Sequence, residues 1–293
     1  MQQRYKELII EKFLLFSALI TILTTIGIIL VLAIEAFKFF SEVSAFEFFT
    51  ETEWTPLYTI KKYGILPLLS GTFITSFIAI LVALPIGLTI AVYLSEYAPK
   101  KFRNSIKPLL ELLAAVPTVV YGFFALTVVT PFLQQFIPGM SGFNSLSAGI
   151  VMGIMIIPII SSLSEDALNA VPYSLREASY GMGSTRLQTA FRVAVPAASS
   201  GIVVSVILGI SRAVGETMIV AIAAGQQPRL TMNPLVPIET LTAYIVQVSL
   251  GDVQHNSIEY RTIFAAGITL FVFTFALNTI SHWVKNKYRE KYE

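Results

Sequence analysis

The sequence predicts an all-α integral membrane protein with six transmembrane helices. Of its 293 residues, 55% are hydrophobic and only 13% are charged, whereas about 25% are charged in an ordinary soluble domain. The mean hydropathy of +0.72 is far too apolar for a water-exposed surface. Several stretches reach the length of about 20 mostly apolar residues that a helix needs to cross the hydrocarbon core. These stretches cover residues 13–34, 66–94, 111–133, 145–163, 197–224 and 261–283.

The first stretch, FLLFSALITILTTIGIILVLAI, is expected to be retained as a membrane helix. It is longer than the roughly 7–15 apolar residues of a secretory signal peptide. No small-residue cleavage site follows it, because large aromatic residues come after Glu35.

Two of the later stretches carry a small residue at every fourth position, a spacing that lets membrane helices approach closely. These residues are Gly71, Thr75, Ala79, Ala83, Gly87 and Ala91 in the second stretch and Gly201, Ser205, Gly209 and Ala213 in the fifth. The pattern predicts a compact bundle and nothing more specific. In the third stretch, Pro117 and Gly122 predict a kinked helix.

Basic residues are unequally divided between the segments that connect the helices. One set of segments, at 1–12, 95–110, 164–196 and the C-terminal tail, carries 14 Lys and Arg residues, and the opposite set carries five. Loops on the cytoplasmic side are enriched in Lys and Arg. We therefore expect a multi-pass protein of the cytoplasmic (inner) membrane, with both termini in the cytoplasm.

Three regions are expected along the chain. Residues 1–65 would hold a cytoplasmic tail, the first helix and an acidic, aromatic outer segment. Residues 66–285 would form the transmembrane core with a cytoplasmic loop at 164–196, and 286–293 would be a cytoplasmic tail. Residues 225–260 contain several prolines and are expected to form a structured outer loop that can include a short re-entrant piece.

The inner loop contains VPYSLREASYGMGSTRLQTAFRVAVP, residues 171–196, which predicts two short helices. Pro172 suits a first helical turn, and Gly181 and Gly183 would end that helix. Ser184 or Thr185 can cap a second helix that runs up to Pro196, where the next span would start. Periodicity alone allows a knob that docks another protein or a helix pair in the lipid headgroups.

A specific motif lies inside this loop. Glu177-Ala178-Ser179, then Gly183, then Val193-Ala194-Val195-Pro196 resembles the EAA loop of binding-protein-dependent ABC transporter permeases, whose pattern is E-A-A-x3-G-x9-I-x-L-P. The chain departs from it at Ser179 and by valine at positions 193 and 195. The resemblance implies a type I (MetI-like) permease bundle whose loop docks on an ATPase subunit.

Further segments narrow the resemblance. GTFITSFIAILVALPIGLTIAVYLSEYAP, LLAAVPTVVYGFFAL and SRAVGETM together look like the phosphate-specific permease of this family. VPTVVYG and the acidic first outer loop favour its C-type over its A-type subunit, although both share Arg-x-x-Gly-Glu. The resemblance implies a heterodimer with a homologous A-type permease, two copies of an ATP-binding subunit and an extracytoplasmic phosphate-binding protein.

Arg212 and Glu216 are opposite charges inside the fifth apolar stretch. An arginine at the centre of a membrane helix costs about 2.5–3.5 kcal/mol on insertion scales. Four residues apart on one helix, the two side chains would share a face and form a pair. One interpretation is a pair that stitches the bundle together. The other is a substrate pathway in which Arg212 binds phosphate transiently, Glu216 neutralises it between cycles, and Ser211 and Thr217 add hydroxyl donors.

Several other functions are disfavoured. The sequence has no cysteine and only two histidines, which predicts no metal centre. It has no G-x-x-x-x-G-K-[ST] motif, so ATP would be used by partner subunits and this chain would need no cofactor. An intramembrane enzyme with Glu216 as base lacks a second catalytic group on another span. We expect a lipid bilayer and no nucleic acid around it. A permease for another oxyanion, such as molybdate or sulfate, stays open, as does an anion channel.

Acidic residues at two further places are expected to have structural roles. Glu111, at the start of the third stretch, is expected to mark the cytoplasmic boundary. Glu165 and Asp166 are expected to cap or flank the first helix of the inner loop.

Overall fold

The computed structural model describes residues 2–287, and almost all of its regular structure is helical. The predicted all-α membrane architecture is confirmed. Four helices are long and apolar enough to cross a membrane, and there are up to six spans if each of two sharply bent helix pairs counts as one. Within residues 2–287, β-type pairing is limited to isolated bridges, Trp54 with Tyr63 and Gly225 with Ile238.

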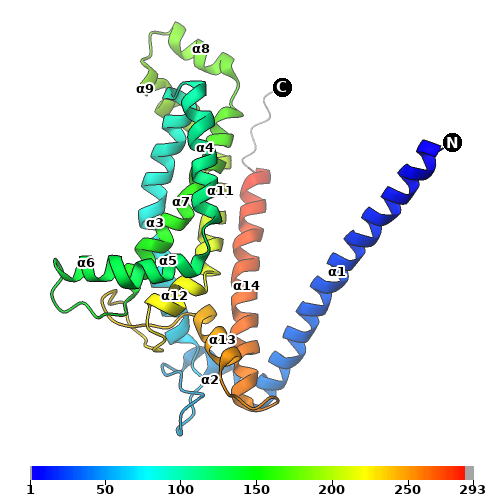
Figure 1. Ribbon diagram of the computed structural model, residues 1–293, viewed down its shortest axis with the longest axis vertical. Coiled ribbons are helices and arrows are strands. Elements are labelled where there is room, and N and C mark those ends of the chain that lie inside the picture. Colours follow the sequence, from blue (N-terminus) through cyan, green and yellow to red (C-terminus); the bar gives the residue numbers. More distant parts are fainter. Residues whose placement is uncertain (1, 288–293) are drawn as a thin grey trace.

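Four long helices dominate the molecule (Figure 1). They are α1 (Gln2–Glu42), α3 (Leu66–Val92), α7 (Ser145–Asn169) and α14 (Ile258–Lys287). The shorter helices are α2 (Ala45–Thr50), α4 (Lys100–Ala115), α5 (Thr118–Phe124), α6 (Thr130–Gln134), α8 (Tyr173–Gly181), α9 (Arg186–Thr189), α10 (Val195–Ala197), α11 (Ser199–Val214), α12 (Met218–Ala223) and α13 (Leu241–Leu250).

Three π-helical turns, η1 (Tyr93–Tyr97), η2 (Ala125–Val129) and η3 (Ala190–Ala194), interrupt the α-helical pattern. Each ends two residues before a proline, at positions 99, 131 and 196. A proline has no N–H and its ring crowds the preceding turn. Before Pro131 and Pro196, where the helix continues, a wider turn accommodates that disruption. Before Pro99 the helix has already ended, since Ala98 is extended.

The bundle is built on α3, α7 and α11, which pack through small residues. A Cβ atom on Gly153 of α7 would lie 2.8 Å from the backbone oxygen of Ala79, and one on Gly87 of α3 would lie 2.9 Å from Ile160. The predicted small-residue stripe is confirmed as a packing surface, since all six of its members in α3 are buried. Ser164 and Ser205 add a buried hydroxyl bond of 2.7 Å between α7 and α11.

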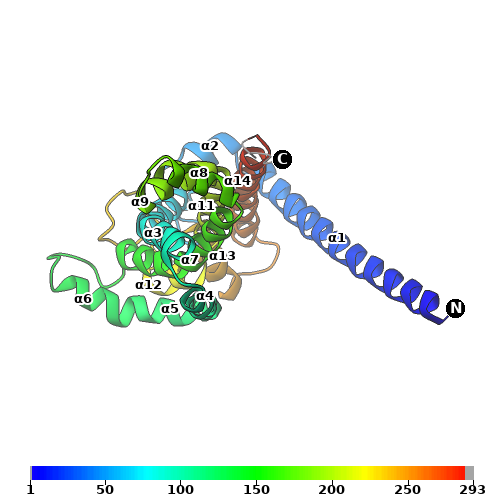
Figure 2. The ribbon, with the colours of Figure 1, turned by 90° about the horizontal axis from the view of Figure 1, so that it is seen from above.

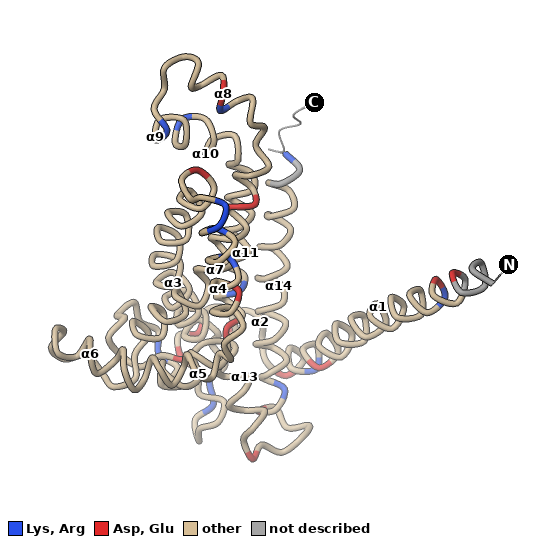
Figure 3. The backbone as a smooth tube through the Cα atoms, turned by 45° about the horizontal axis from the view of Figure 1, so that its top comes forward, with Lys and Arg blue, Asp and Glu red and all other residues tan. Residues whose placement is uncertain are grey.

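Figure 3 shows the long helices α3, α7 and α14 nearly free of charge except close to their ends. The first residues of α1 and the last of α14 lie toward the end of the bundle that carries α8 (Figure 1). Of the basic residues counted at the chain ends, Arg4, Lys6, Lys285, Arg289 and Lys291 have side chains outside the described residues, as does most of the predicted tail at 286–293.

The third predicted span, 111–133, starts too late, and the kink predicted in it is confirmed as a sharp turn at Pro117. Helix α4 begins at Lys100, so Glu111 lies inside this helix, and its place at the membrane boundary stays a prediction. The chain then turns by 83° before the segment Thr118–Gln134. Pro117 explains the turn, because the residue before a proline avoids the helical region, and Val116 has φ −61° and ψ 130°. Figure 1 shows α4 running along the bundle and α5 and α6 lying across it.

The fifth predicted span, 197–224, is not one helix either. Helix α11 covers only Ser199–Val214, and α12 follows a break at residues 215–217. The segment Arg186–Ala197 meets α11 at 73°. Pro196 therefore precedes the bend and does not start the span.

A second core lies at the end of the bundle opposite α8. The segments 35–65 and 225–260, with α2 and α13, pack the aromatic side chains of Phe39, Phe48, Trp54 and Tyr244 against the ends of α3 and α14. Trp54 and Tyr244 meet edge to face with ring centroids 5.0 Å apart. These segments form an ordered cap, as predicted for the second of them.

Helix α1 leaves the bundle at this cap and diverges from it (Figures 1 and 2). No residue of its most apolar window is buried. Apolar side chains all around this helix need lipid or another protein chain to cover them.

Glu239 is a buried acid in the cap. It is 1% exposed, and Oε1 has no hydrogen-bond partner in the described part of the chain. Burial raises the pKa of Glu239 to about 8, because a buried site disfavours the charged form. The folded pKa exceeds the unfolded one, so this group favours folding below about pH 4.5 and its contribution is lost as the pH rises through about 8.

We expect Glu239→Gln to raise the midpoint of thermal unfolding at pH 8.5 and to change it little at pH 5, since the wild-type carboxyl is already neutral at pH 5. Unfolding of the detergent-solubilised protein at both pH values checks this. An equal shift at the two pH values would contradict the assignment.

Candidate functional site

Arg212 and Glu216 lie at the break between α11 and α12. The two side chains form an ion pair, with Arg212 Nη1 2.6 Å from Glu216 Oε2. The predicted pairing is confirmed, but a continuous helix does not produce it. Helix α11 ends at Val214, and Glu216 folds back from the non-helical break toward the last turn.

Glu216 is fixed by the ends of the broken helix. Its Oε1 accepts hydrogen bonds from the backbone N–H groups of Met218 (3.1 Å) and Ile219 (3.3 Å), the first residues of α12. Its own carbonyl accepts a bond of 2.5 Å from the Thr242 hydroxyl of α13. The side chain is 2% exposed. One carboxylate therefore satisfies donors that the helix break exposes and also neutralises Arg212.

Arg212 is the more open partner. Its side chain is 39% exposed, and Nη2 lies 3.5 Å from the thioether sulfur of Met155 on α7. A thioether is a weak acceptor, and a guanidinium carries five N–H donors. Strong donors therefore remain for an anion that reaches this point, in a planar fork that fits two oxygens of a tetrahedral oxyanion.

Neither flanking hydroxyl makes a hydrogen bond to Arg212 or Glu216 among the described residues. Ser211 Oγ is buried and has no hydrogen-bond partner among the described residues. Thr217 Oγ1 donates to the carbonyl of Gly215 at 3.3 Å. Their role as phosphate donors remains a prediction.

The loop between α7 and α11 forms the two short helices that its sequence predicts, although it begins only after α7 ends at Asn169. Pro172 precedes α8, and Gly183 takes the left-handed φ of +83° that ends the first helix. Thr185 caps α9 in a reciprocal capping box with Gln188. Ser179 is buried and bonds Thr189 Oγ1 at 2.9 Å, which ties the two helices together.

The motif residues separate into an outward and an inward set. Glu177 and Ala178 are exposed on α8, Val193 and Val195 are half-buried, and Pro196 is exposed. Large apolar side chains of the loop are also exposed, with Met182 84%, Leu187 58% and Phe191 58% exposed. Exposed apolar side chains next to a charged residue suit a protein partner.

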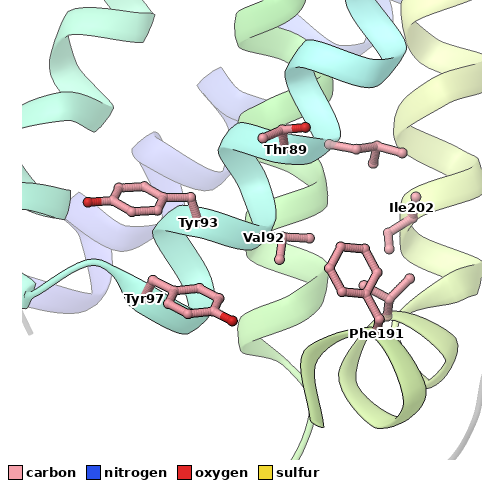
Figure 4. A pocket seen from close by; sticks show the side chains of 8 residues that line it. Thr89, Val92, Tyr93, Tyr97, Phe191 and Ile202 are labelled. Atoms are coloured by element: carbon pink, nitrogen blue, oxygen red, sulfur yellow. The ribbon is translucent and has the colours of Figure 1, made fainter. Parts of the chain in front are cut away.

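An apolar cavity of about 380 Å³ lies behind this loop. Figure 4 shows Phe191 and Ile202 on one side of it and Thr89, Val92, Tyr93 and Tyr97 on the other. Ile202 lies ten residues from Arg212 on α11, about 15 Å at the rise of a helix. With no charged residue in its lining, the cavity is unsuited to an anion.

Sequence reasoning missed Glu96 and Arg176, which form an ion pair of 2.7 Å between the end of α3 and α8. It also misplaced Glu165 and Asp166. Both bind Lys107 of α4, at 2.9 Å and 2.7 Å, and Glu165 also pairs with Arg103. They join α4 to α7 and do not cap α8. Glu96 lies in the polar connecting segment 95–110, which is typical of a surface loop. No residue pattern near Glu96 therefore predicted that it is buried.

Comparison with known proteins shows which protein family the chain matches. Residues 83–290 match the family described as "Binding-protein-dependent transport system inner membrane component". The chain is 36% identical to the probable ABC transporter permease protein YqgH of Bacillus subtilis, over 92% of this chain and 88% of that protein. It is 35% identical to the phosphate transport system permease protein PstC of Mesorhizobium japonicum, over 79% of this chain and 75% of that protein.

Solved structures show the same fold. A bacterial alginate ABC transporter, in complex with an alginate pentasaccharide-bound periplasmic protein, matches with a TM-score of 0.61 and 17% identity over 92% of each chain. The MetNI methionine ABC transporter, in an inward-facing conformation, matches with a TM-score of 0.52 and 21% identity, over 75% of this chain and 94% of its own. The MetI-like bundle that the EAA-type loop implied is thereby confirmed.

Proposed function

Since this chain belongs to the family of binding-protein-dependent transport system inner membrane components, we propose that it is the permease subunit of an ATP-driven importer that moves inorganic phosphate into the cytoplasm. The observation that carries the proposal is Arg212, a half-exposed guanidinium with spare donors at a break in a membrane helix. The relatives named as phosphate transport system permeases support the choice of substrate.

The chain would be the C-type subunit, because those relatives are named PstC. It would pair with a homologous A-type permease, and two ATP-binding subunits and an extracytoplasmic phosphate-binding protein would complete the transporter. The uncovered faces of α1 support a further membrane chain beside this one. The permease core at 66–285 would hold the path, with residues 1–65 as an added helix and outer segment.

Both termini and the α8–α9 loop would lie in the cytoplasm. The family's EAA-type loop, with its exposed apolar side chains, would seat in a cleft of the ATPase. Closure of the ATPase pair on ATP would move α8 and α9 and so switch the bundle between outward and inward openings. The chain would catalyse no reaction itself, since ATP is hydrolysed by its partners.

Arg212 would act as a transient phosphate contact. Phosphate carries one to two negative charges, and it would compete with Glu216 for the guanidinium. Glu216 is held by two N–H groups, so it would stay in place and take Arg212 back after phosphate leaves. A site that rebinds its own counter-ion releases the anion instead of trapping it.

The test is uptake of radiolabelled phosphate by cells that lack their own high-affinity system and carry this chain with its partner subunits. We expect saturable uptake that excess unlabelled phosphate abolishes and that excess sulfate or molybdate leaves unchanged. Inhibition by sulfate or molybdate would assign the permease to that oxyanion, which the same guanidinium fork could bind.

A further inference from the structure

We propose that the Glu96–Arg176 ion pair is the link that carries the movement of α8 into α3, which makes both residues positioning residues for coupling. The inference rests on the proposed transport function. It adds which contact would connect α8 to the transmembrane helices.

Arg176 uses its guanidinium to bind three elements at once. Nη2 lies 2.7 Å and Nε 3.1 Å from Glu96 Oε1, in the π-helical turn at the end of α3. Nη1 donates to the carbonyl of Val171 at 2.7 Å, and Nη2 also donates to that of Leu168 at 2.8 Å. The side chains of Arg176 and Glu96 are only 9% and 3% exposed.

The arrangement favours a mechanical role over a stabilising one. Two charges lose hydration on burial, so a buried ion pair adds little net stability. A guanidinium that grips a carboxylate through two nitrogens does fix distance and orientation. Arg176 directly precedes Glu177, whose side chain is exposed. One turn of α8 therefore exposes Glu177 to a partner and holds Arg176 in the bundle.

Helix α3 continues from this anchor to the substrate site. Near its other end, the Thr72 hydroxyl accepts a bond of 3.1 Å from the N–H of Leu241, at the start of α13. The adjacent Thr242 donates to the carbonyl of Glu216. A displacement of α3 would thus be transmitted through these hydrogen bonds to the backbone of Glu216, the ion-pair partner of Arg212.

The experiment compares Glu96→Gln with Asp166→Asn in the complete transporter, reconstituted in proteoliposomes with its A-type partner, its ATPase and its binding protein. Asp166→Asn removes the ion pair between Asp166 and Lys107. That pair also lies near the end of α7, but it joins α7 to α4 and does not involve α8. The readout is phosphate transported per ATP hydrolysed, with complex assembly checked by size-exclusion chromatography. A residue that only supports the fold would not move this ratio.

We expect Glu96→Gln to lower phosphate transported per ATP by about 2- to 30-fold, the range of single-residue effects on coupling, and Asp166→Asn to leave it at the wild-type value. If Glu96→Gln does not assemble, Glu96→Asp, which keeps the charge on a shorter side chain, is expected to give an intermediate ratio. A wild-type ratio in the assembling variant would overturn the proposal.

Failure of the proposed function would look different. It would appear in the wild type, as absence of phosphate transport, whatever the variants do. If the wild type transports another oxyanion, the same ratio measured with that ion decides the role of Glu96.

Discussion

Replacing Arg212 by glutamine is expected to reduce phosphate uptake by about 10- to 150-fold. The estimate follows from the loss of one hydrogen bond to a charged group, about 1.5–3 kcal/mol, when about 1.4 kcal/mol changes a rate tenfold. Glutamine also leaves Glu216 as a buried carboxylate without its counter-ion, although two backbone N–H groups still bind it. Initial uptake rates in cells, normalised to membrane abundance on a blot, measure the effect.

Two further variants separate a substrate contact from a structural pair. Arg212→Lys keeps the charge but loses the planar fork, so we expect intermediate uptake. Lys12→Gln removes an exposed positive charge from α1 and should leave uptake unchanged. Normal uptake by Arg212→Gln at normal abundance would return the pair to bundle stitching.

Gly71→Ala should prevent normal folding of the chain. A Cβ atom at this position would lie 2.1 Å from the carbonyl oxygen of Glu239 and 2.9 Å from its carbonyl carbon. Both atoms belong to backbone, so no side chain can swing away to relieve the overlap. Overpacking costs about 1–3 kcal/mol and occasionally more, and a clash with fixed backbone belongs at the upper end. The yield of monodisperse protein in detergent and its unfolding midpoint measure the loss.

The matched control is Gly27→Ala in α1, where nothing lies within 4 Å of the added Cβ atom. Alanine favours a helix over glycine by roughly 0.5–1 kcal/mol, so this variant should be at least as stable as the wild type. Equal behaviour of the two variants would mean that α3 and residue 239 are farther apart than described.

The helical architecture could be predicted because its signals are local. Apolar runs locate the long helices α3, α7 and α14 to within several residues of their ends, whereas α1 extends well beyond both ends of the predicted stretch 13–34. The every-fourth-residue pattern from Gly71 to Ala91 identifies the face of α3 that is buried. Ser184 or Thr185 is predicted to cap the second helix of the loop, and Thr185 does so in a capping box with Gln188.

The break between α11 and α12 could not be predicted, because distant residues stabilise it. Gly215 alone would only weaken a helix. The break holds because Thr242, 26 residues away, binds the carbonyl of Glu216, and the Glu216 carboxylate caps α12. Glu96 is a similar case, since its burial depends on Arg176, 80 residues further along the chain. Pro117 predicted a kink. It did not predict that the chain turns by 83°, so that α5 and α6 run in a different direction from α4.

The most direct test of the account is phosphate accumulation in proteoliposomes that contain this chain, its A-type partner and the ATPase. Radiolabelled phosphate, the binding protein and ATP are supplied on the sides that the proposed orientation requires. The account predicts accumulation against a gradient that stops when either ATP or the binding protein is left out. Phosphate flux that persists without ATP would contradict it and indicate a channel.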